Sequence, residues 1–395
     1  MLIAFLCAMG AVNCFLIWKS RLEIAGGHSD FVSFYAAGKI VATGRMSDLF
    51  DPSIQFEVQR HFSRFVDQRG GPFPYVHPLF ESILFVPFSV FSYFSAYLLW
   101  TVINLAILFW LPDLLRPVAP VLKQIPRWLW AITLLAFMPV LSVLVQGQDD
   151  LVLLLLFSLA FLALHRERSA LAGAWVGLAM FRPQFALPLL IILMGRGDWT
   201  LLTGFVLSFG AVAGVTIALF GWSNSLHYPA HVLSWEKASD PIGSLLRVMP
   251  NLHGLCSRLF GFLHSDWAVA VLTAAVSLIV LRFAVVLRQR QGPYLPNVTF
   301  GAAILATILV SYHAFVHDLV LLILAFIGFS EWIWRTDRPF TDRIPYLLVL
   351  ALLLPPLYYP LLSSGLFALL PASFVLLFMW IFVRTRSVGQ TVSPP

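Results

Sequence analysis

Residues 199–221 read WTLLTGFVLSFGAVAGVTIALFG, a run without a single charged side chain. A helix needs about 20 apolar residues to cross the hydrocarbon core of a bilayer, so this stretch predicts a transmembrane helix. The rest of the chain repeats the pattern, since 59% of its 395 residues are hydrophobic and only 11% are charged. An ordinary soluble domain is about 45–50% apolar and about 25% charged. The composition therefore excludes a soluble enzyme and makes the lipid bilayer the first partner.

Similar apolar runs recur along the whole chain. Because backbone groups in hydrocarbon must satisfy their own hydrogen bonds, runs of this length and polarity are expected to be helices. The fold class is therefore an all-α polytopic membrane protein. We expect about twelve transmembrane helices, over residues 2–18, 93–112, 128–145, 150–165, 169–181, 183–195, 199–221, 267–287, 298–312, 318–334, 344–359 and 366–383. Residues 2–18 lack the charged start and the cleavage site of a signal peptide, so we expect a retained first span.

The Lys and Arg residues fix the expected orientation. Counting crossings from an N-terminus on the inside places every short basic gap in the cytoplasm, as the positive-inside rule requires. The formal charge of +6 therefore orients a membrane protein and does not indicate a nucleic-acid partner. The long segments 19–92 and 222–266 become outer loops, with one or two juxtamembrane helices in 19–77 and an interfacial or re-entrant helix in 78–92. Residues 1–335 would form the main transmembrane module, and 336–395 the last helices with a short disordered cytoplasmic tail.

Five polar clusters interrupt the apolar pattern, and this orientation places all of them on the outer side. They indicate that the function is outward-facing. They are HSDFVSFYAAGK with Asp30, PYVHPLFES with Tyr75, His77 and Glu81, QGQDD at 146–150, MFRPQF with Arg182, and SYHAFVHD at 311–318.

Some of these residues also have a purely structural explanation. Asp30, Asp149 and Asp150 each precede or begin an apolar run and could be helix N-caps. His313 and His317 are four residues apart, which on a helix gives one face and would suit a metal pair, a substrate clamp or an interfacial cap. No third ligand is evident, so we expect no metal.

Arg182 and the cysteines complete the candidate residues. Arg182 separates two spans of only about 13 residues, which would place its guanidinium in or just below the headgroup zone. A buried guanidinium there would fit a phosphate, whereas a snorkelling structural arginine is the alternative. The three cysteines, Cys7, Cys14 and Cys256, form no paired framework, so we expect no disulfide.

The order of these motifs resembles a known family. SDFVSFYAAGK with Gly44 and LFDP, then PYVHPLF, GQDD, GAWVGLAMFRPQFALP and SYHAFVHDLVLL are similar to the GT-C membrane glycosyltransferases. Within that group the chain is most similar to glycosyltransferase family 87, proteins related to polyprenyl-phosphate-mannose-dependent α-mannosyltransferases. The resemblance covers roughly residues 25–330.

The resemblance implies a GT-C fold and an inverting hexosyltransferase, and mannose is the sugar that it favours. The donor would be a polyprenyl monophosphate sugar, the acceptor a hydroxyl of a lipid or glycan outside the cytoplasmic (inner) membrane, and no cofactor would be needed. Asp30 maps onto the general base and Arg182 onto the donor-phosphate contact. The remaining substrate-binding positions map onto Gln148 with Asp149 and Asp150, Tyr75 with His77, and the late motif of His313, His317 and Asp318. His77 between Tyr75 and Pro78, and the two acids after Gln148, depart from the usual family pattern.

Two other functions remain open at this stage. A transporter or lipid flippase would also have about twelve spans and a broken helix, but its polar residues would lie near the midplane in repeated halves. A glycan ligase or polymerase would use a polyprenyl diphosphate donor. Among the aromatic residues, Trp222, Tyr228 and Trp235 in the second outer loop are candidates for stacking on a sugar ring.

Overall fold

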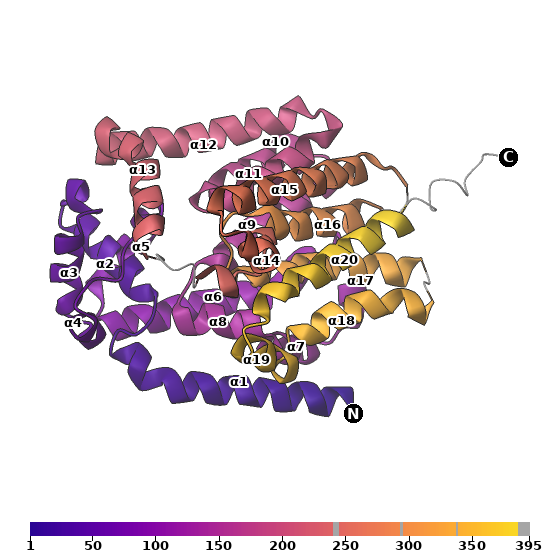
Figure 1. Ribbon diagram of the computed structural model, residues 1–395, viewed down its shortest axis with the longest axis horizontal. Coiled ribbons are helices and arrows are strands. Elements are labelled where there is room, and N and C mark those ends of the chain that lie inside the picture. The colour runs from indigo at the N-terminus through magenta and orange to yellow at the C-terminus, as the bar shows by residue number, and fades with distance from the viewer. Residues whose placement is uncertain (240–244, 293–294, 337–338, 386–395) are drawn as a thin grey trace.

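The computed structural model describes residues 1–239, 245–292, 295–336 and 339–385, and all regular structure in them is helical. Most long helices lie side by side along the longest axis of the molecule (Figure 1). They include α1 (Leu2–Ala25), α6 (Tyr93–Leu115), α12 (Trp199–Phe220), α15 (Asp266–Gln289), α16 (Leu295–Val310) and α20 (Leu370–Arg384).

Several of these helices are suited to crossing a membrane. Five are long and apolar enough, namely α1, α6, α12, α15 and the stretch His317–Arg335 that contains α17 (Leu322–Arg335). The pair α7 (Arg127–Ala136) and α8 (Met138–Gln146) is bent by 74°, and the stretch Thr341–Leu352, which contains α18 (Ile344–Leu352), meets α19 (Pro355–Ser363) at 62°. Counting each bent pair as one span gives up to seven candidates, so the chain is a multi-pass membrane protein.

The other expected crossings coincide with shorter apolar helices. These are α9 (Asp150–His165), α10 (Ser169–Leu178), α11 (Pro183–Leu193), α16 and α20, none longer than 16 residues. A helix of 16 residues is about 24 Å long, which is less than the roughly 30 Å of the hydrocarbon core. Every segment expected from the sequence therefore overlaps a helix, whereas the count of twelve crossings stays a prediction.

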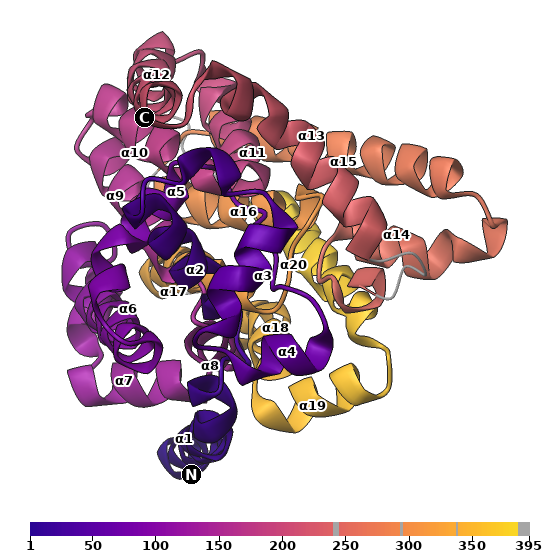
Figure 2. The same cartoon turned by 90° about the vertical axis from the view of Figure 1, so that its left-hand side faces the viewer.

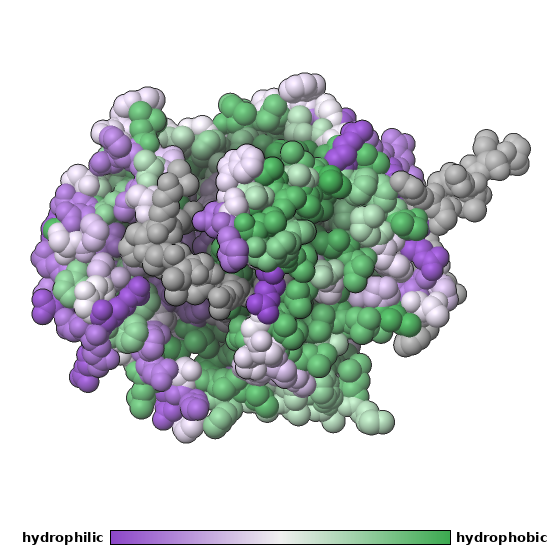
Figure 3. Space-filling view, in the orientation of Figure 1, coloured by the Kyte–Doolittle hydropathy of each residue, from purple (hydrophilic) through white to green (hydrophobic). Residues whose placement is uncertain are grey.

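The surface supports this arrangement. In Figure 3 hydrophobic residues cover most of the middle of the visible face, and hydrophilic residues gather towards both ends of the long axis. Helices α12 and α15 also carry exposed apolar side chains, such as Leu207 and Leu278. Such a continuous apolar surface is unusual on a soluble protein and is normal where lipid is the solvent.

One end of the bundle carries the helices of the first expected outer loop (Figure 2). Three short helices, α2 (Phe31–Ala42), α3 (Pro52–Arg60) and α4 (Arg64–Arg69), lie there, whereas we expected one or two. They separate because Asp51 and Ser63 cap α3 and α4 through their side chains. Helix α1 also continues to Ala25, beyond the expected boundary at residue 18.

Further helices complete this end. Helix α5 (Glu81–Phe85) passes into a 3₁₀ turn over Val86–Val90 and is too short to cross, as expected for a re-entrant or interfacial segment. The second expected outer loop forms α13 (Trp222–Ser239) and α14 (Leu252–Phe260).

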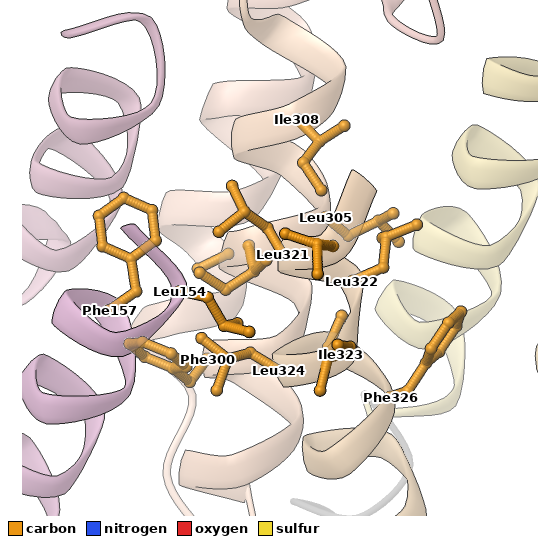
Figure 4. Close-up of a cluster of buried hydrophobic side chains, with 14 of the residues drawn as sticks. Leu154, Phe157, Phe300, Leu305, Ile308, Leu321, Leu322, Ile323, Leu324 and Phe326 are labelled. Atoms are coloured by element: carbon orange, nitrogen blue, oxygen red, sulfur yellow. The ribbon is translucent and has the colours of Figure 1, made fainter. Parts of the chain in front are cut away.

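A core of buried hydrophobic side chains lies between the two ends of the helix bundle. Phe157 of α9, Phe300 of α16 and Leu324 of α17 are buried in the cluster shown in Figure 4. Helix α16 is buried along nearly its whole length, and it packs against α15 and α17. Its sequence is apolar on all sides, which is typical of a helix surrounded by other helices.

Candidate active site

A cavity of about 300 Å³ with several polar wall residues lies between the α2–α5 segment and the longer helices. All five polar clusters of the sequence contribute to its wall. The predicted site residues that line it are Asp30, His77, Gln148, Arg182, His313 and His317.

The turn between α8 and α9 brings two of these residues together. Gly147 ends α8 in the left-handed region with φ 68°, a conformation that glycine adopts without strain. A Cβ atom at this position would lie 2.7 Å from Cβ of Phe31, the first residue of α2. Nε1 of Trp100 on α6 donates a hydrogen bond to the Gly147 carbonyl at 3.0 Å. The turn is therefore held directly against the start of α2, which places Gln148 beside Asp30.

The Gln148 side chain connects the candidate base with the candidate phosphate contact. Its Nε2 donates to Oδ2 of Asp30 at 2.7 Å, and its Oε1 accepts from Nη2 of Arg182 at 2.8 Å. A carboxylate only accepts and a guanidinium only donates, so the two neighbours fix the orientation of the amide. Gln148 therefore couples the positions of the two groups.

Arg182 lies at a break between two helices, as the sequence predicted. The 3₁₀ extension of α10 ends at Phe181 and α11 begins at Pro183, whose ring suits the first position of a helix. The side chain is 7% exposed, and its Nε and Nη2 donate to Oδ1 of Asp149 at 3.1 and 2.5 Å. Nη1 has no hydrogen bond with the described residues.

These contacts differ from the helix caps that were the alternative explanation for the acids. Asp30 and Asp149 occupy N-cap positions, but neither side chain caps its helix. The Asp30 carboxylate faces Gln148, and that of Asp149 faces Arg182. Asp150 is the first residue of α9 and pairs with Nδ1 of His317 at 2.9 Å. Arg182 is bonded inside the bundle, so the interpretation as a snorkelling arginine is wrong.

The expected common face of His313 and His317 is also wrong. Helix α16 ends at Val310 and residues 311–316 are not helical, so the spacing of four does not describe a helix turn. His317 and Asp318 instead lie close to Asp150 of α9, a group of three that the sequence did not reveal. Asp150, His317 and Asp318 offer ligand atoms within 4.8 Å of one another and are the described residues that could hold a metal ion.

Four predicted site residues lie behind the cavity wall. Tyr75 is 1% exposed and donates from its hydroxyl to the Pro78 carbonyl at 2.9 Å, which is a structural contact. Asp149, Asp150 and Asp318 are also fully buried. Oδ2 of Asp318 accepts from the Phe315 backbone at 2.6 Å, and this bond shapes the loop that carries His313.

Glu81 is part of the PYVHPLFES cluster but has no role predicted from the sequence, and it lies beside His77 of the cavity wall. Its carboxyl is buried, and Oε2 lies 3.2 Å from Nδ1 of His77. Burial, and then the negative charge of Asp149, raise the pKa of Glu81 well above its ordinary value. Burial, and then the positive charge of Arg182, lower the pKa of His77. The one available signal was a lone acid in the apolar run 78–92, four residues after His77.

His313 is the third histidine of the cavity wall. Burial, and then the positive charges of His317 and Arg182, lower its pKa to about 4. Its imidazole is therefore neutral near pH 7 and can accept or donate a hydrogen bond without adding charge.

An apolar groove of about 640 Å³ adjoins the polar cavity. The two share Pro78, Pro183, Tyr228, Val232 and Tyr312 in their walls. Other parts of the groove come from α12 and α13, including Phe209, Ala213, Ile217, Trp222 and Leu226. Of the aromatic candidates, Tyr228 lines both spaces and Trp222 lines only the groove, whereas the side chain of Trp235 lies outside the described residues.

The fold and the cavity define a multi-pass membrane protein with a polar site at one end of its helix bundle. A family model described as glycosyltransferase family 87 matches residues 75–311, and the chain belongs to this family. It is therefore a glycosyltransferase, an enzyme that takes a sugar from a donor to an acceptor. No curated protein and no solved structure matches the chain. The matched region includes Gln148 and Arg182, while Asp30 and His317 lie outside it.

Gly147→Ala should destabilise the protein more than Gly44→Ala. Both glycines have a positive φ, so alanine costs about 1–2 kcal/mol of backbone strain at each. Only at Gly147 does the new methyl group also displace Phe31, which adds about 1–3 kcal/mol, because nothing lies within 4 Å at Gly44. Thermal unfolding of the detergent-purified variants measures the difference, and equal losses would contradict the close approach.

Glu81→Gln should change how stability depends on pH. Because the folded-state pKa of Glu81 is raised, its contribution is full below about pH 4.5 and is lost as the pH rises through the folded pKa. Glutamine stays neutral at every pH, so the variant does not lose this contribution. The melting temperature of the variant minus that of the parent should therefore increase as the pH rises. Glu57→Gln, at an exposed position, is the control and should show no such trend. Parallel pH profiles for Glu81→Gln and the parent would refute the buried neutral carboxyl.

Proposed function

We propose that the protein is an inverting glycosyltransferase that moves a hexose from a polyprenyl monophosphate to an acceptor hydroxyl. The favoured hexose is mannose. The acceptor is a lipid or glycan on the outer side of the cytoplasmic membrane. One observation carries the proposal: the Asp30 carboxylate and the Arg182 guanidinium line the same cavity and are joined through Gln148. A base and a cation on one cavity are what sugar transfer from a lipid phosphate requires.

The reaction needs two kinds of assistance. The Asp30 carboxylate takes the proton of the acceptor hydroxyl while the hydroxyl oxygen attacks the anomeric carbon. The bond between that carbon and the phosphate oxygen breaks, and the electron pair leaves with the polyprenyl phosphate. Attack from the face opposite the leaving group inverts the anomeric configuration. Fixed positive charge near the departing phosphate lowers the barrier because it stabilises the charge that develops there.

Arg182 is already held in position for this role. Asp149 and Gln148 bind its Nε and Nη2, so the guanidinium is oriented before any ligand arrives. The free Nη1 can then donate to a phosphate oxygen without rearrangement. Burial strengthens this contact, since the effective dielectric constant around a buried group is lower than in water.

The adjoining groove supports a lipid-linked donor. Its wall is mostly apolar, with Phe209, Ala213 and Ile217 of α12 on one side. A polyprenyl chain in the groove would be removed from water while its phosphate enters the polar cavity beside Arg182. Each buried methylene contributes about 0.8 kcal/mol to binding.

The arrangement of charges supports an outward-facing site. Figure 1 shows the N-terminus and the end of α20 at the end of the molecule opposite α2 and α3. Arg166, Arg196 and Arg288 lie at or just after the helix ends that lead away from the cavity. The positive-inside rule assigns that opposite end to the cytoplasm.

Asp30→Asn should reduce transfer by about 10²–10⁴-fold, because asparagine cannot take the proton. The fold should persist, since the asparagine oxygen can still accept from Gln148. The measurement is release of polyprenyl phosphate from synthetic polyprenyl-phosphate mannose by purified protein with a membrane-lipid extract as acceptor. Asp67→Asn, an exposed acid that pairs with Arg60 on α3, is the control and should keep normal activity. Near-normal release by Asp30→Asn would eliminate Asp30 as the base, and release only from a diphosphate donor would favour a ligase.

Ala213→Phe should raise the KM for a long-chain donor by about tenfold and leave the KM for a short-chain donor nearly unchanged. The ring would fill part of the groove and prevent burial of about two methylenes. Ala211→Phe lies on the same helix at an exposed position outside the groove and serves as the control. An equal rise for both donors would show that the groove does not hold the chain.

A further inference from the structure

A second cavity, of about 250 Å³, lies at the far end of two helices that lead away from the candidate active site. Helix α9 begins at Asp150 in the site and ends at His165 on this cavity, about 24 Å away by helical rise. Helix α16 runs between the same two ends in the opposite direction. The two cavities therefore lie at opposite ends of α9 and α16, the helices that carry Phe157 and Ile308 of the core in Figure 4.

Arg288, in the last turn of α15, is the residue that indicates a ligand. Its side chain lines the cavity and is only 8% exposed. Among the described residues it has no ion pair and no side-chain hydrogen bond, and its Nε is buried without a partner. Arginine keeps its charge in proteins, so this is a buried cation without an anion. Burying an uncompensated charge is costly, and such groups are normally paired.

Two acids lie near the cavity, but neither pairs with the Arg288 guanidinium. Asp198 is the acid whose field acts on Arg288, but its Oδ1 accepts from the Leu201 backbone at 3.2 Å as the cap of α12. Glu167 lies on the cavity wall but is exposed to solvent. Neither acid forms an ion pair with Arg288, so no carboxylate of the described residues is bonded to its guanidinium.

A second guanidinium is fixed on the same wall. Arg196 donates from Nε to the Arg288 carbonyl at 2.9 Å and from Nη2 to the Arg290 carbonyl at 3.1 Å. Nε2 of Gln289 donates to the Gly195 carbonyl at 2.7 Å, which ties the same loop to the end of α15. Backbone contacts thus bring two like charges to one cavity although they repel each other, and an anion between them would relieve the repulsion.

The rest of the wall is apolar. Phe161 of α9 and Phe300 of α16 stack with ring centroids 4.3 Å apart, and Leu164 lies beside them. A cavity lined both by two guanidinium groups and by apolar side chains suits an amphiphile better than a free ion. Basic pockets between helices at a membrane surface commonly bind lipid headgroups.

We propose that this cavity binds the phosphate group of an anionic membrane lipid between Arg288 and Arg196, at the end of the bundle opposite the candidate active site. The proposal is independent of the donor and acceptor proposed above. It concerns the lipids that surround the protein and does not involve the transferred sugar.

The test compares thermal unfolding of the full-length protein in detergent with added phosphatidylglycerol, phosphatidylcholine or inorganic phosphate. Phosphatidylglycerol should stabilise the parent more than the other two do. Arg288→Met should weaken the apparent affinity for phosphatidylglycerol by about tenfold or more, because a charge-assisted hydrogen bond is lost. Arg166→Met removes an exposed charge at the same end without touching the cavity and should leave the affinity unchanged.

A further readout separates binding from a structural role. Without anionic lipid, Arg288→Met should unfold at the same or a higher temperature than the parent, since it removes an uncompensated buried charge. A lower temperature together with unchanged phosphatidylglycerol affinity would show that Arg288 is only structural. Leu164→Trp keeps both arginines but fills the cavity, so it should also lose the lipid effect. Equal stabilisation by inorganic phosphate and phosphatidylglycerol, or equal loss in Arg166→Met, would overturn the proposal.

Discussion

The buried ion pair between Arg182 and Asp149 is the interaction on which the site depends. Burying a guanidinium within a helix bundle is costly unless its charge is compensated and its hydrogen bonds are made. Asp149 supplies the charge, and Gln148 extends the contact to Asp30 on a different helix. The same contacts that make the arginine acceptable therefore fix the distance between the proposed base and the proposed phosphate contact.

The backbone prepares this arrangement at two interruptions of apolar helices. Gly147 lets α8 end in a tight turn against α2, and Pro183 starts α11 directly after Arg182. At both points the chain leaves regular helix where polar groups are needed. Irregular backbone at membrane depth is stable only where it is buried in protein or lines a cavity, and here it does both. The long apolar helices then serve as a rigid frame that separates polar groups at the two ends.

Much of the candidate site could be predicted because sidedness is a global property of the sequence. The clusters around Asp30, Gln148 and Arg182 were placed at one end from basic gaps and span counts, and the structure brings them to one cavity. Prediction failed where it relied on local spacing. His313 and His317 were assigned to one helical face, but α16 ends at Val310, and His317 finds its partner in Asp150, 167 residues away. Glu81 is named in a polar cluster but receives no predicted role, because a single acid in an apolar run has no pattern.

The sequence by itself determined that the chain is a helical membrane protein, where its helices lie, and which polar residues interrupt them. These features follow from composition and from the requirement that backbone in lipid be helical. Only the tertiary structure decided that Gln148 joins Asp30 to Arg182, that the Tyr75 hydroxyl binds the Pro78 carbonyl, and that Arg288 is buried without an ion pair to the described residues. The physical reason is that partners of buried polar groups are chosen by packing between distant helices, and no local periodicity records which helices meet.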